Sequence, residues 1–314
     1  MKIRSASILR PVGFVVLWLF AASPATAALA ARTWVSGIGD DANPCTRTTP
    51  CKTFAGAIAK TAAGGEIDAL DPGEYGSVDI TQSVTIDGGA EMAKILVPTN
   101  RTGVNIFASS YDTVTLRNLT LQSLSPGTGT GIDIVGGRNV LIEHCAVFGT
   151  RNGIAFTPVF GMSLMVSDTT VENAVEGGIW VNPGGTNLYF ARMTATRVRL
   201  DGNGWGLVVR DNCLVFVSDS SASNNRIDGF IVHPQFGGAA ELDLENVSSS
   251  NNGNTGAVAY NSGSVIRLSN VTIDHNGGAG VVPLAGGLIL SFGNNRFAAN
   301  VGGDGTINGP AVAK

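Results

Sequence analysis

A four-residue pattern recurs through most of the chain: a glycine, an apolar residue, any residue and a second apolar residue. Its copies lie 22 to 28 residues apart. Self-similarity near 25 residues is typical of a solenoid, in which each repeat buries its hydrophobic face against its neighbours. A leucine-rich repeat would show a fixed leucine spacing, and a propeller would need about 40 residues or more per unit. The repeat glycines are Gly103, Gly131, Gly153, Gly178, Gly206, Gly229, Gly256 and Gly280.

Polar residues recur between these glycines. Asparagine tolerates left-handed backbone geometry and hydrogen-bonds turn backbone, so one per coil at a fixed corner predicts a ladder of stacked side chains. His144 and Arg192 occupy such corners and are interpreted as structural. The first column is Asn118, His144, Asp168, Arg192, Asp219, Asn246, Asn270 and Asn294, and a second is Asn225, Asn252, Asn276 and Asn300. Short alternating strands between such corners predict an all-β chain, a single-stranded right-handed parallel β-helix of about nine coils.

The segment before the repeats predicts a short helix. Phe54 and Ile58 are four residues apart on one helical face, Thr53 is a suitable N-cap, and Gly64-Gly65 is expected to end the helix. Such a helix would cap the open end of the solenoid, which otherwise exposes unpaired strand edges. We expect this helix to belong to a β-helix domain of residues 53–314, after an irregular segment of residues 28–52.

The helix, the strand that follows it and the turn Pro72-Gly73-Glu74-Tyr75 resemble the start of pectate-lyase-like right-handed β-helix proteins. The coils are similar to that superfamily's repeats from about Thr53 to Asn300. The resemblance implies the fold and leaves the reaction open, because the superfamily includes lyases, hydrolases, esterases, epimerases, tailspikes and non-catalytic surface proteins. The paired acids of a polygalacturonase-like hydrolase and the calcium-binding acids of a pectate-lyase-like enzyme have no match in the sequence.

The first 27 residues predict a secretory signal peptide. Three basic residues precede an apolar run at 12–22, and Ala25-Thr26-Ala27 offers a cleavage site, with Ala30 as an alternative. The run is too short for a membrane span, which needs about 20 residues. We therefore expect a protein of the periplasm, the cell surface or the extracellular space, with no membrane span after cleavage.

Four cysteines remain in the exported chain. Cys45 and Cys51 lie close together in a Pro-rich segment, and an oxidising compartment favours a disulfide between them. A zinc site is not expected there, because no further Cys or His lies nearby in the sequence to complete the ligands. Cys145 and Cys213 fall in β segments and are interpreted as buried apolar residues. No metal and no cofactor is expected.

The charge of the chain argues against nucleic acid as a partner. There are 20 Lys and Arg against 24 Asp and Glu, and charged residues make up only 14% of the sequence. Binding a phosphate backbone needs clustered basic residues. An acidic polysaccharide is compatible with this balance provided that a few basic residues converge locally.

Residues two and four positions after each repeat glycine are expected to point outward and to stack from coil to coil. The fourth positions would gather Asn182, Arg210, His233 and Tyr260 beside Trp180. An aromatic ring can stack on a sugar, and an arginine can pair with a uronate carboxylate. We predict that Trp180, Asn182 and Arg210 bind carbohydrate.

Two other functions remain open at the sequence level. In a uronate lyase or epimerase, His233 would be the base, Arg210 would neutralise the carboxylate and Tyr260 would be the acid. In an assembly or surface protein, the apolar outward stripe that includes Val208, Ile231 and Val258 would form a homo-oligomer contact.

Overall fold

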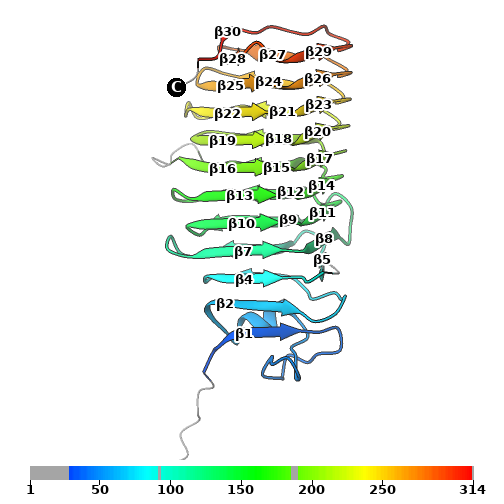
Figure 1. The fold of residues 1–314 in the computed structure, drawn as a ribbon, viewed down its shortest axis with the longest axis vertical. Coiled ribbons are helices and arrows are strands. Elements are labelled where there is room, and N and C mark those ends of the chain that lie inside the picture. Colours follow the sequence, from blue (N-terminus) through cyan, green and yellow to red (C-terminus); the bar gives the residue numbers. More distant parts are fainter. Residues whose placement is uncertain (1–27, 91–92, 185–189, 313–314) are drawn as a thin grey trace, which may run out of the picture.

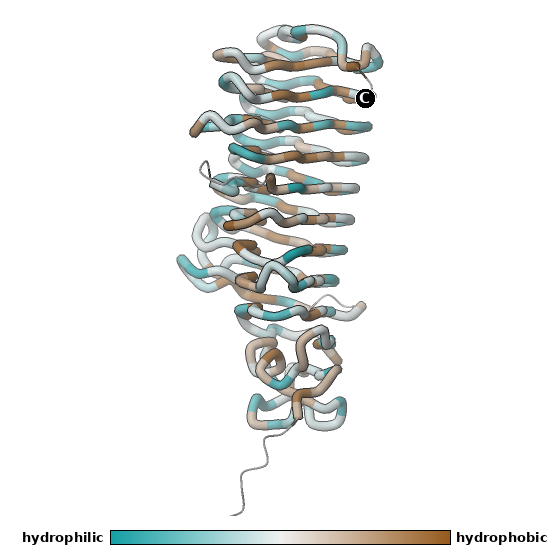
Figure 2. Tube along the Cα trace, turned by 90° about the vertical axis from the view of Figure 1, so that its left-hand side faces the viewer, coloured by the Kyte–Doolittle hydropathy of each residue, from teal (hydrophilic) through white to brown (hydrophobic). Residues whose placement is uncertain are grey.

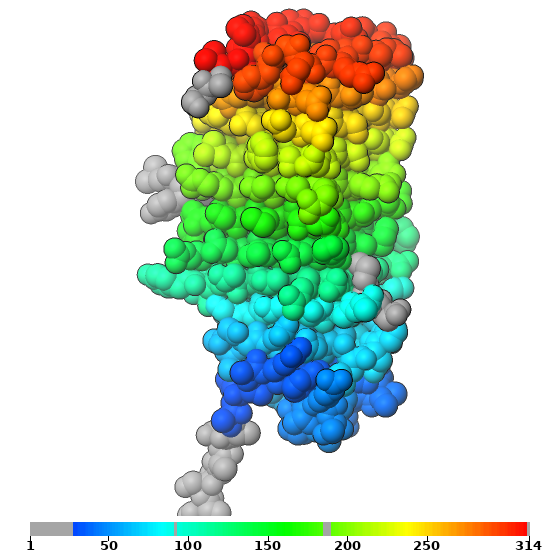
Figure 3. Space-filling model, in the orientation of Figure 1, coloured from blue at the N-terminus to red at the C-terminus, as the bar shows by residue number. Residues whose placement is uncertain are grey.

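The structure, a computed structural model, describes residues 28–90, 93–184 and 190–312, so the expected signal peptide lies outside the described residues. The chain forms a right-handed parallel β-helix whose coils stack into a rod (Figures 1 and 3). Most coils contribute one strand to each of three sheets, A, B and C in chain order, and each strand pairs with the equivalent strands of neighbouring coils. In the described part of the chain no helix has the length and apolar character that crossing a membrane would need.

The strand bounds are as follows. Sheet A contains β1 (Ala30–Val35), β2 (Thr61–Ala69), β4 (Val84–Asp87), β7 (Thr113–Arg117), β10 (Asn139–Glu143), β13 (Ser163–Ser167), β16 (Ala191–Thr196), β19 (Cys213–Ser218), β22 (Ala240–Glu245), β25 (Ser264–Ser269), β28 (Leu288–Ser291) and β30 (Gly309–Pro310). Sheet B contains β5 (Ala93–Val97), β8 (Leu119–Ser123), β11 (Ala146–Phe148), β14 (Thr170–Glu172), β17 (Arg199–Asp201), β20 (Ser221–Ser223), β23 (Ser248–Ser250), β26 (Thr272–Asp274) and β29 (Arg296–Ala298). Sheet C contains β3 (Val78–Ile80), β6 (Thr102–Phe107), β9 (Thr130–Gly136), β12 (Asn152–Phe156), β15 (Gly177–Val181), β18 (Trp205–Val209), β21 (Phe230–Val232), β24 (Ala257–Tyr260) and β27 (Val281–Leu284).

The repeat glycines lie at the start of the sheet C strands, where successive coils approach closely. A Cβ added to Gly206 would lie 2.4 Å from the carbonyl oxygen of Gly229 in the next coil, so only glycine fits. The residue after each glycine points into the bore and is fully or almost fully buried, as the sequence predicted, and hydrophobic segments recur coil by coil (Figure 2). These bore residues are Val104, Ile132, Ile154, Ile179, Leu207, Phe230, Ala257 and Val281.

The first polar column forms the corner between sheets A and B, with one exception. Most of its members have a left-handed backbone, for example Asn118 at φ 56° and His144 at φ 49°. The corner residue of the β16 coil is Arg197, with φ 53°, and the prediction of Arg192 was wrong. Arg192 lies within β16 on the exposed outer face of sheet A.

The second column forms a continuous asparagine ladder at the corner between sheets B and C. The side-chain oxygen of Asn252 accepts from the backbone N–H and the side-chain amide of Asn225, at 3.1 and 2.9 Å. The same arrangement links Asn252 to Asn276 and Asn276 to Asn300. The predicted ladder is confirmed, and it starts one coil earlier, at Asn203, whose N–H donates to Asn225.

Within the residues that the structure describes there is one short helix, α1 (Phe54–Ile58), near the N-terminal end of the rod (Figure 1). The Thr53 side chain accepts from the N–H of Gly56 and forms the predicted N-cap. The predicted stop at Gly64-Gly65 was wrong, because the helix ends at Ile58 and both glycines lie inside β2. The edge strand of sheet A at this end is β1, so the helix shares the end of the solenoid with a strand.

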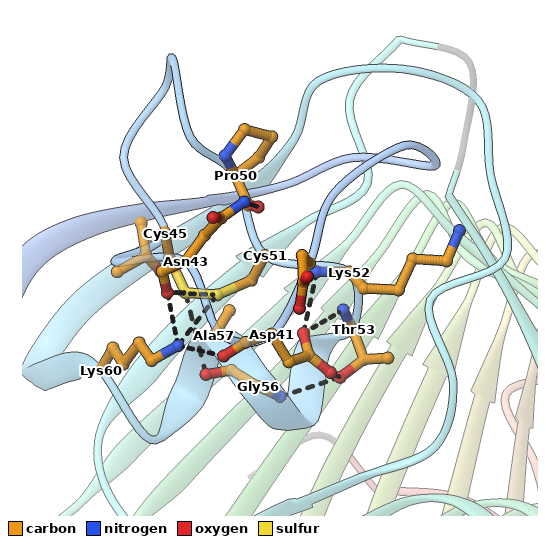
Figure 4. The surroundings of a disulfide bond; sticks show 12 residues. Asp41, Asn43, Cys45, Pro50, Cys51, Lys52, Thr53, Gly56, Ala57 and Lys60 are labelled. Atoms are coloured by element: carbon orange, nitrogen blue, oxygen red, sulfur yellow. Dashed lines mark hydrogen bonds between the residues drawn. A yellow bond between two sulfur atoms is a disulfide. The ribbon is translucent and has the colours of Figure 1, made fainter.

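The segment before α1 is held by Asp41 and by a disulfide (Figure 4). Burial alone would raise the pKa of Asp41, but hydrogen bonds from Thr53 and the Lys52 N–H lower it below its ordinary value. Cys45 and Cys51 form the predicted disulfide, with their Cα atoms 4.6 Å apart. The ammonium of Lys60 donates to backbone carbonyls of Asp41 and Asn43 beside the bridge.

Cys145 and Cys213 are free thiols and both are buried. Cys213 is in β19, while Cys145 lies at the corner between β10 and β11, not on a strand as predicted. Burial raises the pKa of Cys145 to about 12 and also raises the pKa of Cys213. Neither thiol is therefore activated as a nucleophile in the folded protein.

Thiol counting checks this assignment. The folded protein should give almost no reaction with a thiol reagent, because both free thiols are buried and protonated. Denaturation without reductant should reveal two thiols, from Cys145 and Cys213, and reduction should bring the number to four. Four reactive thiols before reduction would contradict the Cys45–Cys51 bridge.

Candidate functional site

The predicted polar column forms where sheet C strands end. Asn182 follows β15, Arg210 follows β18 and His233 follows β21, and the N–H of each donates to a carbonyl of the preceding coil. Tyr260, the last residue of β24, occupies the next coil. Equivalent positions on successive parallel coils are about 4.8 Å apart, so the four side chains share one file.

Arg210 links this file to Trp180. Its guanidinium carbon lies 4.9 Å from the centroid of the Trp180 ring, within the range of a cation–π contact. Its Nη1 donates to Nδ1 of His233 at 2.9 Å, and the His233 ring lies 4.5 Å from the Tyr260 ring between centroids. Trp180, Arg210, His233 and Tyr260 therefore form one contiguous group, called here the aromatic–basic cluster. Within the described part of the chain, the Asn182 side chain makes no hydrogen bond or ring contact with these four residues.

The Arg210 contact decides the protonation of His233. A guanidinium can only donate, so Nδ1 accepts and the proton of the neutral imidazole is on Nε2. Burial and the nearby charge of Arg210 lower the pKa of His233, which favours the neutral ring. In this arrangement Nε2 is a hydrogen-bond donor. A role as base would require His233 to release Arg210 first.

Arg210 itself has unmet hydrogen-bonding capacity. It is half-buried, burial lowers its pKa, and it forms no ion pair with any carboxylate in the part of the chain that the structure describes. Its Nε is buried without an acceptor there. A buried guanidinium N–H without a partner is costly, which distinguishes this side chain from an ordinary surface arginine.

Two further residues shape the cluster and escaped the sequence analysis. Trp205 packs edge-on against Trp180, with centroids 6.3 Å apart and an interplanar angle of 73°. Gly177 makes room for the indole, since a Cβ there would lie 3.0 Å from Cε3 of Trp180. Both residues immediately precede a repeat glycine, an outward position that could have been included in the pattern.

Two buried carboxyl groups, those of Asp211 and Asp228, hydrogen-bond to residues that lie next to the cluster. Asp211 accepts hydrogen bonds from the N–H groups of Gln235, Phe236 and Gly238, which fixes the loop that follows His233. Burial raises the pKa of Asp228, whose carboxyl is also hydrogen-bonded to Trp205 and Thr255. Both acids therefore position other groups and are not free to bind a ligand.

The apolar outward stripe is mostly covered within a single chain. Val208 is 1% exposed and Val258 is 6% exposed, while Ile231 between them is half-buried. Of these three positions, only Ile231 is partly accessible. The stripe therefore offers little apolar area for the homo-oligomer contact considered above.

The three parallel sheets, the glycine repeats and the asparagine ladder define a right-handed β-helix repeat protein. Within this class, residues 107–306 match the family described as periplasmic copper-binding protein (NosD), and the chain belongs to that family. The sequence matches none of the curated proteins.

Solved structures with the same fold include a phage tailspike domain and a rhamnogalacturonan lyase. The enzymatically active domain of bacteriophage CBA120 tailspike protein 2 superposes with a TM-score of 0.57 at 11% identity, over 81% of this chain and 48% of that one. A rhamnogalacturonan lyase superposes with a TM-score of 0.51 at 12% identity, over 80% of this chain and 74% of that one. The chain thus spans about half the length of the tailspike domain. At these identities the likeness shows the fold alone.

The described residues do not fit the copper site that the family's description implies. One group of three potential ligands is present among them: Glu66, Asp68 and Asp87. Arg117 pairs with Glu66 at 2.7 Å and with Asp87 at 2.8 Å, and Arg32 pairs with Asp68. Carboxylates neutralised by guanidinium groups are poor copper ligands, because copper favours imidazole and sulfur donors.

Proposed function

We propose that this protein binds acidic polysaccharide in the periplasm or outside the cell, through the aromatic–basic cluster on sheet C. The observation that carries the proposal is Arg210, a half-buried cation that lies over the Trp180 ring and has no carboxylate partner among the described residues. In a chain with net charge −4, such a group favours an acceptor supplied from outside. A uronate carboxylate can accept from the guanidinium N–H groups that His233 does not occupy, and Trp180 or Tyr260 offers a ring face for the sugar.

Binding without catalysis is favoured over a lyase or epimerase. A base for proton abstraction needs a free lone pair within reach of the substrate. The only lone pair of neutral His233 is directed at Arg210, and its Nε2 is a donor. Nε2 is suited to hold a sugar oxygen, and the family's description as periplasmic supports the proposed compartment.

Replacing Arg210 by Ala should weaken the binding of oligouronates by about 1.5 to 3 kcal/mol, the usual contribution of charge-assisted hydrogen bonds. Calorimetric titration with oligomannuronate or oligogalacturonate measures this difference. Arg47→Ala, at an exposed position in the disulfide segment, is the matched control and should bind as the unmodified protein does.

Unchanged binding in Arg210→Ala would reject the cluster as the site. The same oligomers should be followed by ultraviolet absorbance with the unmodified protein, since β-elimination creates an absorbing double bond. A steady rise in absorbance would favour the lyase alternative over binding alone.

A further inference from the structure

A second polar surface lies on another side of the rod, at the corner between sheets A and B. It is a hollow of about 630 Å³ that crosses five coils, called here the sheet B trough. Its lining includes three arginines and one aspartate, so the trough is positive although the whole chain is negative. The remaining lining residues are mostly Ser, Thr and Asn.

One file of outward residues runs the length of the trough. The strand registers pair Arg199 with Ser221, Ser221 with Ser248, Ser248 with Thr272, and Thr272 with Arg296. Each step is one strand spacing, so the two arginines are separated by about 19 Å along the solenoid axis. Three hydroxyl groups stand between them.

Within the described part of the chain, the donors in this file have one contact with an acceptor side chain, a long one made by Arg199. Arg296 has no carboxylate partner among the described residues, and Arg199 has only Asp201, at 3.8 Å, with 64% of its own side chain exposed. The hydroxyls of Ser221, Ser248 and Thr272 make no hydrogen bond to any other residue in the described part of the chain.

The corner residues beside this file are, by contrast, already paired. Arg197 forms two hydrogen bonds with the carboxylate of Asp168, at 2.6 and 2.7 Å. The amide of Asn246 donates to Asp219, and the amide of Asn270 donates to Asn246 at 3.2 Å. This second file forms a fixed wall, and its pairing leaves Arg199 and Arg296 as the available cations.

We propose that the sheet B trough binds a linear acidic polysaccharide lying parallel to the solenoid axis. Successive sugars of an extended chain advance by a distance close to the strand spacing, so each coil can meet one sugar. Arg199 and Arg296 would pair with anionic groups near the two ends of the bound segment, and the three hydroxyls would hydrogen-bond the sugars between them. This site does not depend on the aromatic–basic cluster, which lies where the sheet C strands end.

Length dependence tests the proposal most directly. In calorimetric titration, a hexamer of mannuronate can span both arginines, whereas a dimer reaches only one. We expect the double variant Arg199→Gln/Arg296→Gln to weaken hexamer binding about ten-fold, because both arginines are solvent-exposed and an exposed ion pair contributes less than a buried one. Dimer binding, already weak, should change little. Raising the ionic strength should weaken hexamer binding to the unmodified protein.

The matched control is Arg47→Gln/Arg138→Gln, which removes the same charge at two exposed positions outside the trough. The control should bind the hexamer as the unmodified protein does. Equal losses in the two double variants, or no loss in the trough variant, would overturn the proposal. Thermal unfolding of each variant verifies that the fold is kept.

Arg210→Ala separates this inference from the proposed function. If Arg210→Ala abolishes hexamer binding and the trough variant retains it, the trough is not a site and the aromatic–basic cluster stands. If the trough variant loses binding and Arg210→Ala retains it, the trough is the site and the aromatic–basic cluster is not. Partial losses in both variants would support two independent sites.

Discussion

Replacing Phe230 by Asp should lower the free energy of unfolding by about 4 kcal/mol or more. The Phe230 side chain is fully buried in the bore, where it is flanked in register by Leu207 of the preceding coil and Ala257 of the next. An aspartate there would lose the ring's packing, leave a cavity and bury a carboxylate without a partner. Each of these costs is large, and together they place the variant among severely destabilising changes.

The adjacent residue supplies the control. Ile231 is next along β21, points outward and is half-buried, so Ile231→Asp keeps its carboxylate in contact with water. Urea unfolding followed by circular dichroism should show a much lower midpoint for Phe230→Asp than for Ile231→Asp. Similar midpoints would mean that the inward and outward positions of sheet C have been assigned wrongly.

The inward and outward positions of sheet C could be predicted from the sequence because two independent patterns fix them. The repeat glycine marks the place where coils approach most closely, as Gly206 against Gly229 shows. The period-2 alternation after it then determines which side chains enter the bore. A shift of one residue would bury Arg210 and His233 and expose Phe230. The alternative register is therefore much less stable than the observed one.

The corner in the β16 coil could not be predicted, because two arginines lie five residues apart near it. Arg192 would give intervals of 24 and 27 residues to Asp168 and Asp219, whereas Arg197 gives 29 and 22. The regular spacing favours Arg192, but the chain between β15 and β16 is longer than in neighbouring coils and moves the corner to Arg197. The interval between repeats in the sequence is the sum of the strand and loop lengths. Only the backbone geometry shows how much of it belongs to the loops.

The grouping of Arg210, His233 and Tyr260 was predictable from the sequence, whereas their contacts were not. Stacking of equivalent positions brings Arg210, His233 and Tyr260 into one file whatever their rotamers. The position of Arg210 over Trp180 depends on side-chain torsions and on the space left by Gly177. The direction of the Arg210 to His233 hydrogen bond, which determines the imidazole tautomer, likewise follows only from three-dimensional geometry.

Replacing Asn252 by Ala should lower the free energy of unfolding by about 2 to 5 kcal/mol. Asn252 is almost fully buried, and its side-chain oxygen accepts from the N–H and the side-chain amide of Asn225. Its own amide donates to the Ala222 carbonyl at 3.1 Å and to Asn276 at 2.9 Å. Alanine would leave several buried polar groups without partners, and each costs about 1 to 3 kcal/mol.

The neighbouring Asn251 separates this hydrogen bonding from the backbone requirement of the corner. Asn251 is exposed and carries the left-handed backbone, with φ 56°, so Asn251→Gly should be nearly neutral in urea unfolding. Because Asn252 and Asn276 share a hydrogen bond, the double variant Asn252→Ala/Asn276→Ala should lose less stability than the sum of the single losses. Strict additivity would mean that the ladder acts as separate corners, whereas a deficit shows that the stacked amides stabilise neighbouring coils jointly.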